Sequence, residues 1–163
     1  MDESAILETS SLYSIAGLLS EEQPIVSHRP FRTVYHTASP LSLSGGGNLG
    51  RPGEMALAHH GILFLDELLE FDRKAIEILR EPLESKEVRF SRVSGTYKYP
   101  ADFSLIATTN PCPCGFLGDN EKECRCSPAE IERYSHKLSG PIVDRIDLFV
   151  AVPRLKTLDF TES

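Results

Sequence analysis

Basic side chains are in the minority in this sequence, and long apolar runs are missing. Its 163 residues include 17 lysines and arginines against 24 aspartates and glutamates, a formal net charge of −7. A chain with this balance does not coat nucleic acid or an anionic membrane electrostatically, although a local basic element can contact either. No apolar run approaches the roughly 20 residues of a membrane-spanning helix, and the acidic start Met1-Asp2-Glu3 is unlike a signal peptide. We expect one cytoplasmic domain without a membrane partner.

Cysteine is also scarce, and the few cysteines are close together. All four lie within fifteen residues, at Cys112, Cys114, Cys124 and Cys126, whereas the disulfides of a secreted protein join distant parts of a fold. The pattern C-x-C, nine residues, C-x-C offers four thiolates to a tetrahedral Zn²⁺, and Gly115 and Gly118 give the loop freedom to fold back. Reduced thiols without a metal are the alternative. We expect zinc to brace this loop.

Helix and strand signals alternate along the chain. Apolar spacing and capping residues predict helices over residues 4–19 and 53–61, after Asp72, and after a capping box at Ser127, with a loop over residues 26–51. Apolar runs predict strands over residues 62–65, 103–108 and 148–152. Strands that alternate with helices predict an α/β fold, with a parallel sheet flanked by helices.

Polar residues follow these predicted strands. Asp66 and Glu67 come directly after the first strand, and Asn110 follows the second. Because ligands bind beyond the carboxyl ends of parallel strands, a carboxylate pair there suits a nucleoside triphosphatase, in which Asp66 holds Mg²⁺ and Glu67 polarises the attacking water. Asn110 can orient water or a phosphate, and Arg145, just before the last strand, can stabilise a transferring phosphoryl group. The alternative interpretations are an acidic helix start for Asp66 and Glu67, an Asn-Pro turn for Asn110 and a local ion pair for Arg145.

The order of these residues resembles the AAA+ ATPase core, with its Walker B pair, sensor 1 asparagine and arginine finger. More narrowly, residues 27–153 resemble the magnesium chelatase-related family in its ComM/YifB-type branch. Besides the Walker B run, the matching motifs are His28-Arg29-Pro30-Phe31-Arg32, Gly45-Gly46-Gly47, Arg51-Pro52-Gly53-Glu54, Leu57-Ala58-His59, Leu79-Arg80-Glu81-Pro82-Leu83-Glu84, Asn110-Pro111-Cys112-Pro113-Cys114-Gly115 and Leu138-Ser139-Gly140-Pro141. The resemblance implies a partial AAA+ P-loop core with an inserted β-hairpin, use of ATP and Mg²⁺, and self-association into a ring.

The sequence departs from the family pattern in two ways. The phosphate-binding loop G-x-x-x-x-G-K-[ST] does not occur, and too few residues follow the last predicted strand for the family's lid domain. Gly45-Gly46-Gly47 cannot replace the loop, because no lysine follows it, and we expect it to be a flexible surface loop. We therefore expect residues 1–163 to be the central part of one AAA+ core domain that does not hydrolyse ATP alone. The second departure is Val34-Tyr35-His36, where relatives tend to have Pro-His-His, and it suggests no mechanism.

A hairpin is predicted between the Walker B helix and the sensor strand. Alternation places Val88, Phe90, Tyr97 and Tyr99 on one face and Arg89 with Lys98 on the other, with the tip at Ser94-Gly95. Residues 86–98 carry four basic side chains, Arg92 among them, against Glu87 alone. In the chelatase-related clade a hairpin at this point faces the central pore of the ring. The resemblance and the charge together indicate Arg89, Arg92 and Lys98 as DNA contacts, and a solvated hairpin is the alternative.

Three functions remain open at this point. The first is a ring-forming ATPase that acts on DNA, and the second is the ATPase subunit of magnesium chelatase, which drives metal insertion into a porphyrin. The third is a non-catalytic fragment that binds partners or metal. His59 and His60, at a helix end, are expected to pack or to complement the helix dipole rather than to catalyse a reaction.

Overall fold

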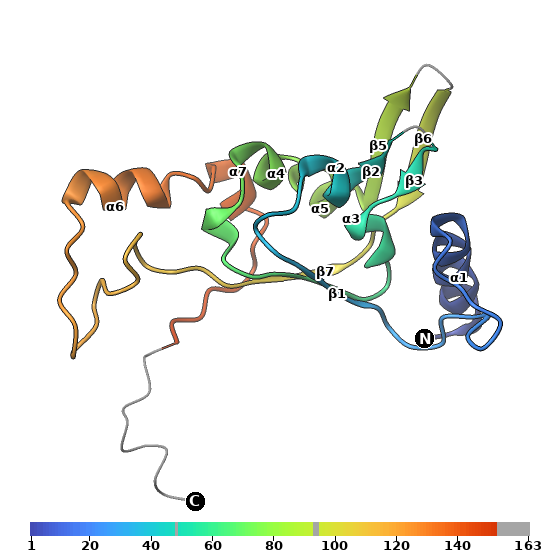
Figure 1. Ribbon diagram of the computed structural model, residues 1–163, viewed down its shortest axis with the longest axis horizontal. Helices are drawn as coiled ribbons and strands as arrows, with labels where there is room; N and C mark the ends of the chain where they lie inside the picture. Colours follow the sequence, from blue (N-terminus) through green and yellow to red (C-terminus); the bar gives the residue numbers. More distant parts are fainter. Residues whose placement is uncertain (48, 93–94, 153–163) are drawn as a thin grey trace, which may run out of the picture. The chain divides into compact units, whose positions relative to one another are not determined.

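The computed structural model describes residues 1–47, 49–92 and 95–152, and its chain forms two compact units, Met1–Thr109 and Asn110–Ser163. The first unit contains a three-stranded parallel sheet in the order β1-β4-β7 (Figure 1). Its strands are β1 (Phe31–Val34), β4 (Ile62–Leu65) and β7 (Ser104–Ala107). The predicted α/β class, a parallel sheet with helices, is confirmed.

The two faces of this sheet differ in burial. Leu63 and Leu65 of β4 are fully buried on one face. On the other face, Phe31 stacks on Phe64 with ring centroids 6.0 Å apart, yet Phe31 is 60% exposed. In this unit, as far as it is described, the sheet is thus packed on one face and open on the other.

Short helices lie on one side of the sheet (Figure 1). They are α2 (Pro40–Ser44), α3 (Glu54–Leu57), the 3₁₀ turn η1 (Leu68–Glu70), α4 (Arg73–Glu77) and α5 (Arg80–Ser85). Asp72 caps α4 as predicted, because its carboxylate accepts the Lys74 backbone N–H at 2.8 Å. The predicted helix continues as two helices, and its apolar residues Ile76 and Leu79 are fully buried.

The prediction of a loop over residues 26–51 is wrong, because β1, α2 and the short strand β2 (Gly45–Gly46) lie within it. β2 pairs antiparallel with β3 (Arg51–Pro52). β1 lacks the run of apolar residues that predicts a buried strand, because Arg32 lies on the covered face, in register with Leu63. Arg32 is held there by two hydrogen bonds to the Glu54 carboxylate, at 2.7 and 2.9 Å. An ion pair therefore takes a position that an apolar side chain usually fills.

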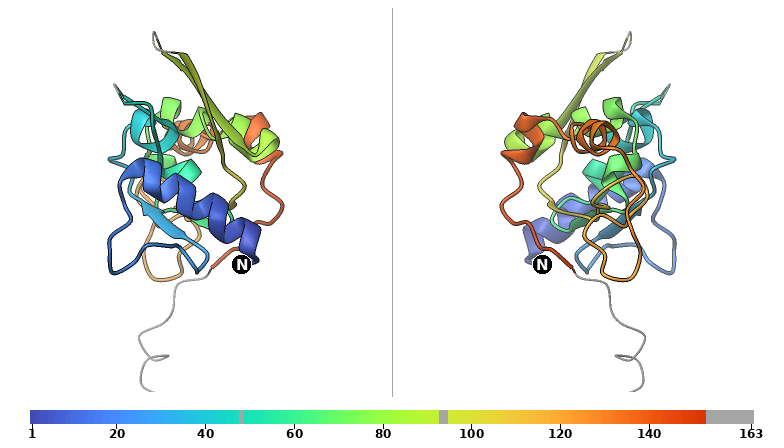
Figure 2. Two further views of the ribbon diagram at one scale, coloured as in Figure 1. Left: turned by 90° about the vertical axis from the view of Figure 1, so that its right-hand side faces the viewer. Right: turned by 90° about the vertical axis from the view of Figure 1, so that its left-hand side faces the viewer.

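The hairpin is confirmed. β5 (Glu87–Arg92) pairs antiparallel with β6 (Gly95–Pro100), and Val88 opposes Tyr99 while Arg89 opposes Lys98. Figures 1 and 2 show it extending away from the other elements of the first unit. Its base is anchored, since the Tyr99 hydroxyl donates to the Gly50 carbonyl at 2.7 Å in a buried position. The predicted tip residue Ser94 lies outside the described residues.

The N-terminal helix α1 (Glu3–Ala16) packs on the same region. Its Leu12 forms a buried cluster with Ala56 of α3 and Tyr99 of the hairpin. The helix begins at Asp2, whose carboxylate accepts the Ala5 N–H, and ends at Gly17, which has a left-handed backbone with φ of 75°. The predicted helix over residues 4–19 is confirmed, with an earlier end.

The described part of the second unit, residues 110–152, contains the helices α6 (Pro128–Ser135) and α7 (Gly140–Val143). The predicted capping box at Ser127 is confirmed, because Ser127 and Glu130 each bond the other's backbone N–H. The predicted strand over residues 148–152 is wrong: this segment has no strand, and its Leu148, Phe149, Val150 and Val152 side chains are at least 65% exposed. It pairs with no strand in the described part of the chain, and an apolar run without a neighbouring strand forms no ladder.

Candidate functional site

The carboxyl ends of the three parallel strands meet at one edge of the sheet. Val34, Leu65 and Ala107, the last residues of β1, β4 and β7, lie side by side in register. The polar residues that follow them are therefore brought close together. They are His36, the pair Asp66 and Glu67, and Thr108.

Thr108 organises the turn that carries the carboxylate pair. Its hydroxyl donates to Asp66 Oδ1 at 2.6 Å and accepts the Glu67 backbone N–H at 2.9 Å. Its carbonyl accepts the Leu68 N–H at 2.8 Å. Glu67 has φ of 54°, a left-handed conformation that strains a residue with a Cβ. These hydrogen bonds stabilise the strained turn, fix the direction of the Asp66 carboxylate and hold the Glu67 backbone.

His36 contacts the second carboxylate. Its Nδ1 lies 3.4 Å from Glu67 Oε2, and both side chains are about half exposed. Sequence reasoning missed His36 because β1 was not predicted, and it missed Thr108 because that residue was counted as the end of a strand. The signal that could have found both is their position after parallel strands, Thr108 directly after β7 and His36 one residue further on after β1.

The edge offers carboxylate oxygens to a cation and to water. Mg²⁺ prefers such oxygen ligands and keeps several waters, one of which a neighbouring carboxylate can polarise. Asn110 and Arg145 belong to the second unit. Arg145 is half-buried, and its Nη1 donates to the Pro141 carbonyl at 2.5 Å. Their predicted roles beside the carboxylates stay predictions.

The four cysteines converge within the second unit. Cys112 Sγ lies 3.4 Å from Cys114 Sγ and 3.6 Å from Cys124 Sγ, and Cys114 Sγ lies 3.6 Å from Cys124 Sγ. With Cys126 included, all four sulfur atoms lie within 4.8 Å of one another. None of them is in a disulfide, and Cys112 is buried.

The thiols influence one another's ionisation. Hydrogen bonds from the Phe116 and Arg125 backbone lower the pKa of Cys114 to about 6. For Cys126, a hydrogen bond from the Cys114 backbone lowers the pKa, but burial and the neighbouring sulfur atoms outweigh it and raise the pKa to about 12. Four crowded thiols do not all ionise without a cation among them.

A second cluster joins α1 to the loop before β4. Glu8 Oε2 lies 3.0 Å from His59 Nε2 and 3.1 Å from His60 Nε2. The Asp102 backbone N–H donates to His59 Nδ1 at 3.0 Å, so the proton of neutral His59 is on Nε2 and is donated to Glu8. Burial lowers the pKa of His59 and favours this neutral form. The cluster therefore fastens α1, and the expected packing role of the histidines agrees with it.

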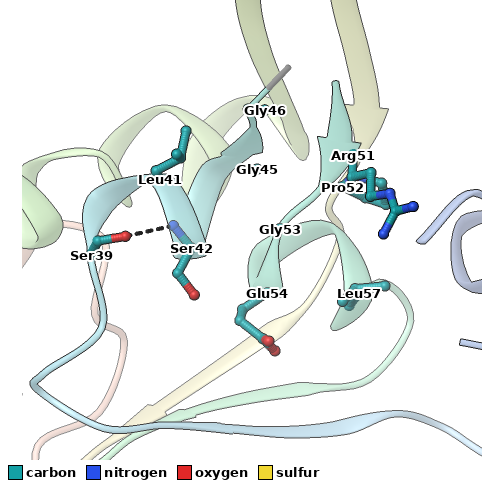
Figure 3. A pocket seen from close by; sticks show the side chains of 11 residues that line it. Ser39, Leu41, Ser42, Gly45, Gly46, Arg51, Pro52, Gly53, Glu54 and Leu57 are labelled. Carbon is teal, nitrogen blue, oxygen red and sulfur yellow. Dashed lines mark hydrogen bonds between the residues drawn. The ribbon is translucent and has the colours of Figure 1, made fainter. Parts of the chain in front are cut away.

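The glycine-rich segment lines a cavity of about 430 Å³ (Figure 3). A Cβ on Gly45 would lie 2.4 Å from the Gly53 nitrogen and 2.5 Å from the Arg51 oxygen. Gly45 therefore lets two backbone segments approach closely, and Gly45–Gly46 pair with β3 in place of the flexible loop that we expected. Phosphate binding is not needed to explain them.

On the hairpin, Glu87 lies between the two basic side chains that sequence analysis singled out. Its carboxylate accepts the Arg89 Nη2–H at 2.8 Å, and Lys98 Nζ lies 2.5 Å from its other oxygen. Hydrogen bonds from Lys98 and Arg89 lower the pKa of Glu87, so it stays ionised and offsets part of the local positive charge. The side chain of Arg92, the third predicted DNA contact, lies outside the described part of the structure.

Comparisons with known proteins identify the family. The family model for magnesium chelatase, subunit ChlI, matches residues 1–160. YifB of Salmonella typhimurium is 44% identical over 147 residues, 90% of this chain and 28% of YifB. Competence protein ComM of Haemophilus influenzae is 43% identical over 157 residues, 95% of this chain and 30% of ComM.

A more distant relative, the magnesium-chelatase 67 kDa subunit of Heliobacterium mobile, is 30% identical over 114 residues, 63% of this chain and 17% of that protein. The chain spans less than a third of YifB and of ComM. Across the residues described, no helix has the length and apolar character needed to cross a membrane. The resemblance seen in the motifs is confirmed, and the chain belongs to the magnesium chelatase, subunit ChlI, family.

Proposed function

We propose that this chain contributes the Mg²⁺- and water-positioning edge of an ATPase that assembles as a ring in the intact protein. The observation that carries the proposal is the pair Asp66 and Glu67, held at the carboxyl end of β4 by the Thr108 hydroxyl. Asp66 binds Mg²⁺ directly or through water, and Glu67 polarises the water that attacks the γ-phosphate. Family membership supports the use of ATP and Mg²⁺.

Two residues of the second unit complete the proposed machinery. Asn110 orients the attacking water or the γ-phosphate, and Arg145 stabilises the transition-state charge on a nucleotide held by the neighbouring subunit of the ring. In this structure the Arg145 guanidinium is held against α7, because its Nη1 donates to the Pro141 carbonyl, so this bond must open when Arg145 reaches a phosphate. The phosphate-binding loop does not occur in these residues. We therefore expect the chain alone to bind Mg²⁺-ATP weakly and to turn it over slowly.

Mutation of Glu67 in the intact protein tests the proposed hydrolysis. Glu67→Gln keeps the size of the side chain but removes the base, so ATP turnover falls at least about 100-fold while nucleotide binding persists. Glu70→Gln is the matched control, because Glu70 is an exposed carboxylate three residues away. Turnover of Glu67→Gln at the rate of the unmodified protein contradicts the proposal.

We propose DNA as the partner on which the motor acts, with contact through the hairpin. Arg89 and Lys98 share one face of it, in register. Both are paired with Glu87, so a phosphate group must compete with that carboxylate. If the hairpin contacts DNA, removal of the Glu87 charge strengthens DNA binding. If the hairpin is merely solvated, the same change leaves DNA binding unaltered.

Two variants of the intact protein test this contact. Arg89→Ala with Lys98→Ala weakens DNA binding and flattens its salt slope by about 1.8, which corresponds to two phosphate contacts. Glu87→Gln strengthens binding, because both cations become available. Arg73→Ala with Lys74→Ala removes two exposed cations from α4 and is the charge-matched control. Unchanged affinity in the first two variants removes the hairpin from the DNA path.

Unchanged DNA affinity in the hairpin variants favours the second candidate, an ATPase subunit that drives metal insertion into a porphyrin. The match to the magnesium-chelatase 67 kDa subunit favours this candidate, although its identity of 30% is lower than the 43% to ComM. DNA-independent turnover that a porphyrin-binding partner stimulates is the result expected for it.

A further inference from the structure

We infer that Cys112, Cys114, Cys124 and Cys126 bind one Zn²⁺ ion, which holds together a segment that lacks a hydrophobic core. The inference is independent of the proposed ATPase function. It rests on the sulfur geometry, on the hydrogen bonds around the sulfurs and on the burial of the surrounding residues.

The separations of the sulfur atoms fit a single tetrahedral ion. Zn–S bonds of about 2.3 Å in a tetrahedron place the sulfurs about 3.8 Å apart. The observed separations of 3.4, 3.6 and 3.6 Å are close to this value, and the fourth sulfur also lies within 4.8 Å of the others. A disulfide requires about 2.05 Å. A polynuclear iron–sulfur cluster needs its cysteines farther apart, because they bind different iron atoms.

Backbone N–H groups surround the sulfurs in a repeated arrangement. The backbone of Phe116 bonds Cys114 Sγ, and the backbone of Cys126 bonds Cys124 Sγ, two residues along the chain in both cases. The Cys114 backbone also bonds Cys126 Sγ and so ties one C-x-C pair to the other. N–H donors of this kind stabilise the thiolates that a metal requires, and fix their directions.

The segment needs such a cross-link because it buries almost nothing else. Over residues 110–130, all of which are described, Cys112 is the only buried residue. A segment without apolar burial cannot offset the entropy of ordering its backbone, and metal binding supplies that free energy. Zn²⁺ displaces the thiol protons to solvent as it binds.

The zinc site fixes both neighbours of the segment. Cys112 comes two residues after Asn110, and Cys126 directly precedes Ser127, the N-cap of α6. The ion therefore joins the predicted sensor residue to the start of α6. Its role is structural, since four cysteines leave no open coordination position for a substrate.

Metal analysis of the 163-residue chain tests the inference. When the chain is prepared in zinc-containing medium, it binds about one equivalent of zinc per chain, as expected for a closed four-cysteine site. Replacement by Co²⁺ gives sulfur-to-cobalt charge-transfer bands and the intense visible bands of tetrahedral cobalt. Zinc below about a tenth of an equivalent, with four thiols open to a thiol reagent, overturns the inference, because bound thiolates are protected. Stoichiometric iron or two disulfides overturns it as well.

A pair of variants shows that the cysteines hold the ion. Cys124→Ser removes one ligand, so the zinc content drops and the tetrahedral cobalt spectrum disappears. Glu123→Gln changes the neighbouring exposed residue and retains full zinc. Full zinc content with an unchanged cobalt spectrum in Cys124→Ser overturns the inference. If Cys124→Ser does not fold, metal content and the cobalt spectrum of the unmodified chain still decide the question.

Discussion

The sheet edge in the first unit and the cysteine segment in the second hold polar side chains in two different ways. At the edge, Asp66 and Glu67 follow a strand whose Leu63 and Leu65 are fully buried, and Thr108 completes the turn with hydrogen bonds. In the cysteine segment, Cys112 is the single buried residue over residues 110–130. There the sulfurs themselves form the centre of the local structure.

The difference shows two routes to a fixed geometry. A packed strand fixes a side chain through apolar burial, which contributes about 25 cal/mol per Å² and requires no ligand. A cross-link at a metal fixes a loop with few apolar residues, but only while the ion is bound. The two regions should therefore respond to different perturbations.

The largest effect is expected where ATP turnover requires a residue from the second unit. Arg145→Ala in the intact protein lowers turnover about 1,000-fold and leaves nucleotide binding intact, because an arginine finger acts mainly on the transition state. Arg133→Ala, which removes an exposed arginine of α6, is the control and leaves turnover unchanged. Steady-state ATPase assays measure both.

Mixed rings distinguish action on a neighbouring subunit from a purely structural role. Arg145→Ala subunits mixed with Glu67→Gln subunits regain activity at interfaces that combine an intact Glu67 with an intact Arg145. An absence of recovery at every ratio shows that Arg145 acts within its own subunit or only through its bond to Pro141.

Apolar truncation separates the two regions by stability. Leu63→Ala, in a fully buried position of β4, lowers the free energy of unfolding by about 2–5 kcal/mol. Leu117 lies in the cysteine segment and is 43% exposed, so Leu117→Ala changes the free energy of unfolding by less than about 0.5 kcal/mol. Denaturant titration measures both, and equal losses would remove the distinction between the regions.

The Thr108 hydroxyl gives a smaller effect within the sheet edge. Thr108→Val removes the bonds to Asp66 and to the Glu67 N–H and lowers the free energy of unfolding by about 1 kcal/mol. Thr108→Ser keeps the hydroxyl and restores most of this loss. If Thr108→Val is as stable as the unmodified chain, the hydrogen bonds of the hydroxyl do not stabilise the turn.

The smallest effect is a pH dependence at the attachment of α1. Burial lowers the pKa of His59 below its usual value of 6.5. As the pH falls, His59 is therefore protonated in the unfolded chain before it is protonated in the folded chain. The contribution of neutral His59 to the free energy of unfolding is complete above pH 6.5, and it is lost as the pH falls through the lower pKa of His59 in the folded protein. Hydrogen bonds from His59 and His60 lower the pKa of Glu8, so acidification below its usual 4.5 removes more stability.

Denaturant titrations between about pH 7.5 and about pH 5 measure this dependence, because the interval includes the ordinary histidine pKa. His59→Asn keeps an acceptor for the Asp102 N–H and flattens the dependence. His136→Asn changes an exposed histidine of the second unit and leaves it unaltered. An unchanged pH dependence in His59→Asn assigns the effect to another group.

Sequence analysis predicted the elements whose signals are local. The apolar run of β4, the alternation of the hairpin and the capping box at Ser127 each lie within a few residues of sequence. The same holds for Asp66 and Glu67, which follow an uninterrupted apolar strand, and for the cysteines, whose spacing predicted that their sulfur atoms come together.

The missed features depend on partners far away in sequence. β1 was missed because Arg32 is held on the covered face by Glu54, 22 residues later. Thr108 and His36 gained their roles only when parallel pairing brought three strand ends together. The strand predicted over residues 148–152 failed for the converse reason, since its apolar pattern has no neighbouring strand within the described residues.

Hydrogen exchange of the zinc-loaded chain, measured before and after removal of the metal by a chelator, tests the central distinction most directly. Amides that are protected by packing keep their protection without the metal, whereas amides that depend on the ion do not. We predict that residues 110–130 lose protection, while β4 and β7 remain protected. Unchanged protection over residues 110–130, or an equal loss in β4 and β7, contradicts the account.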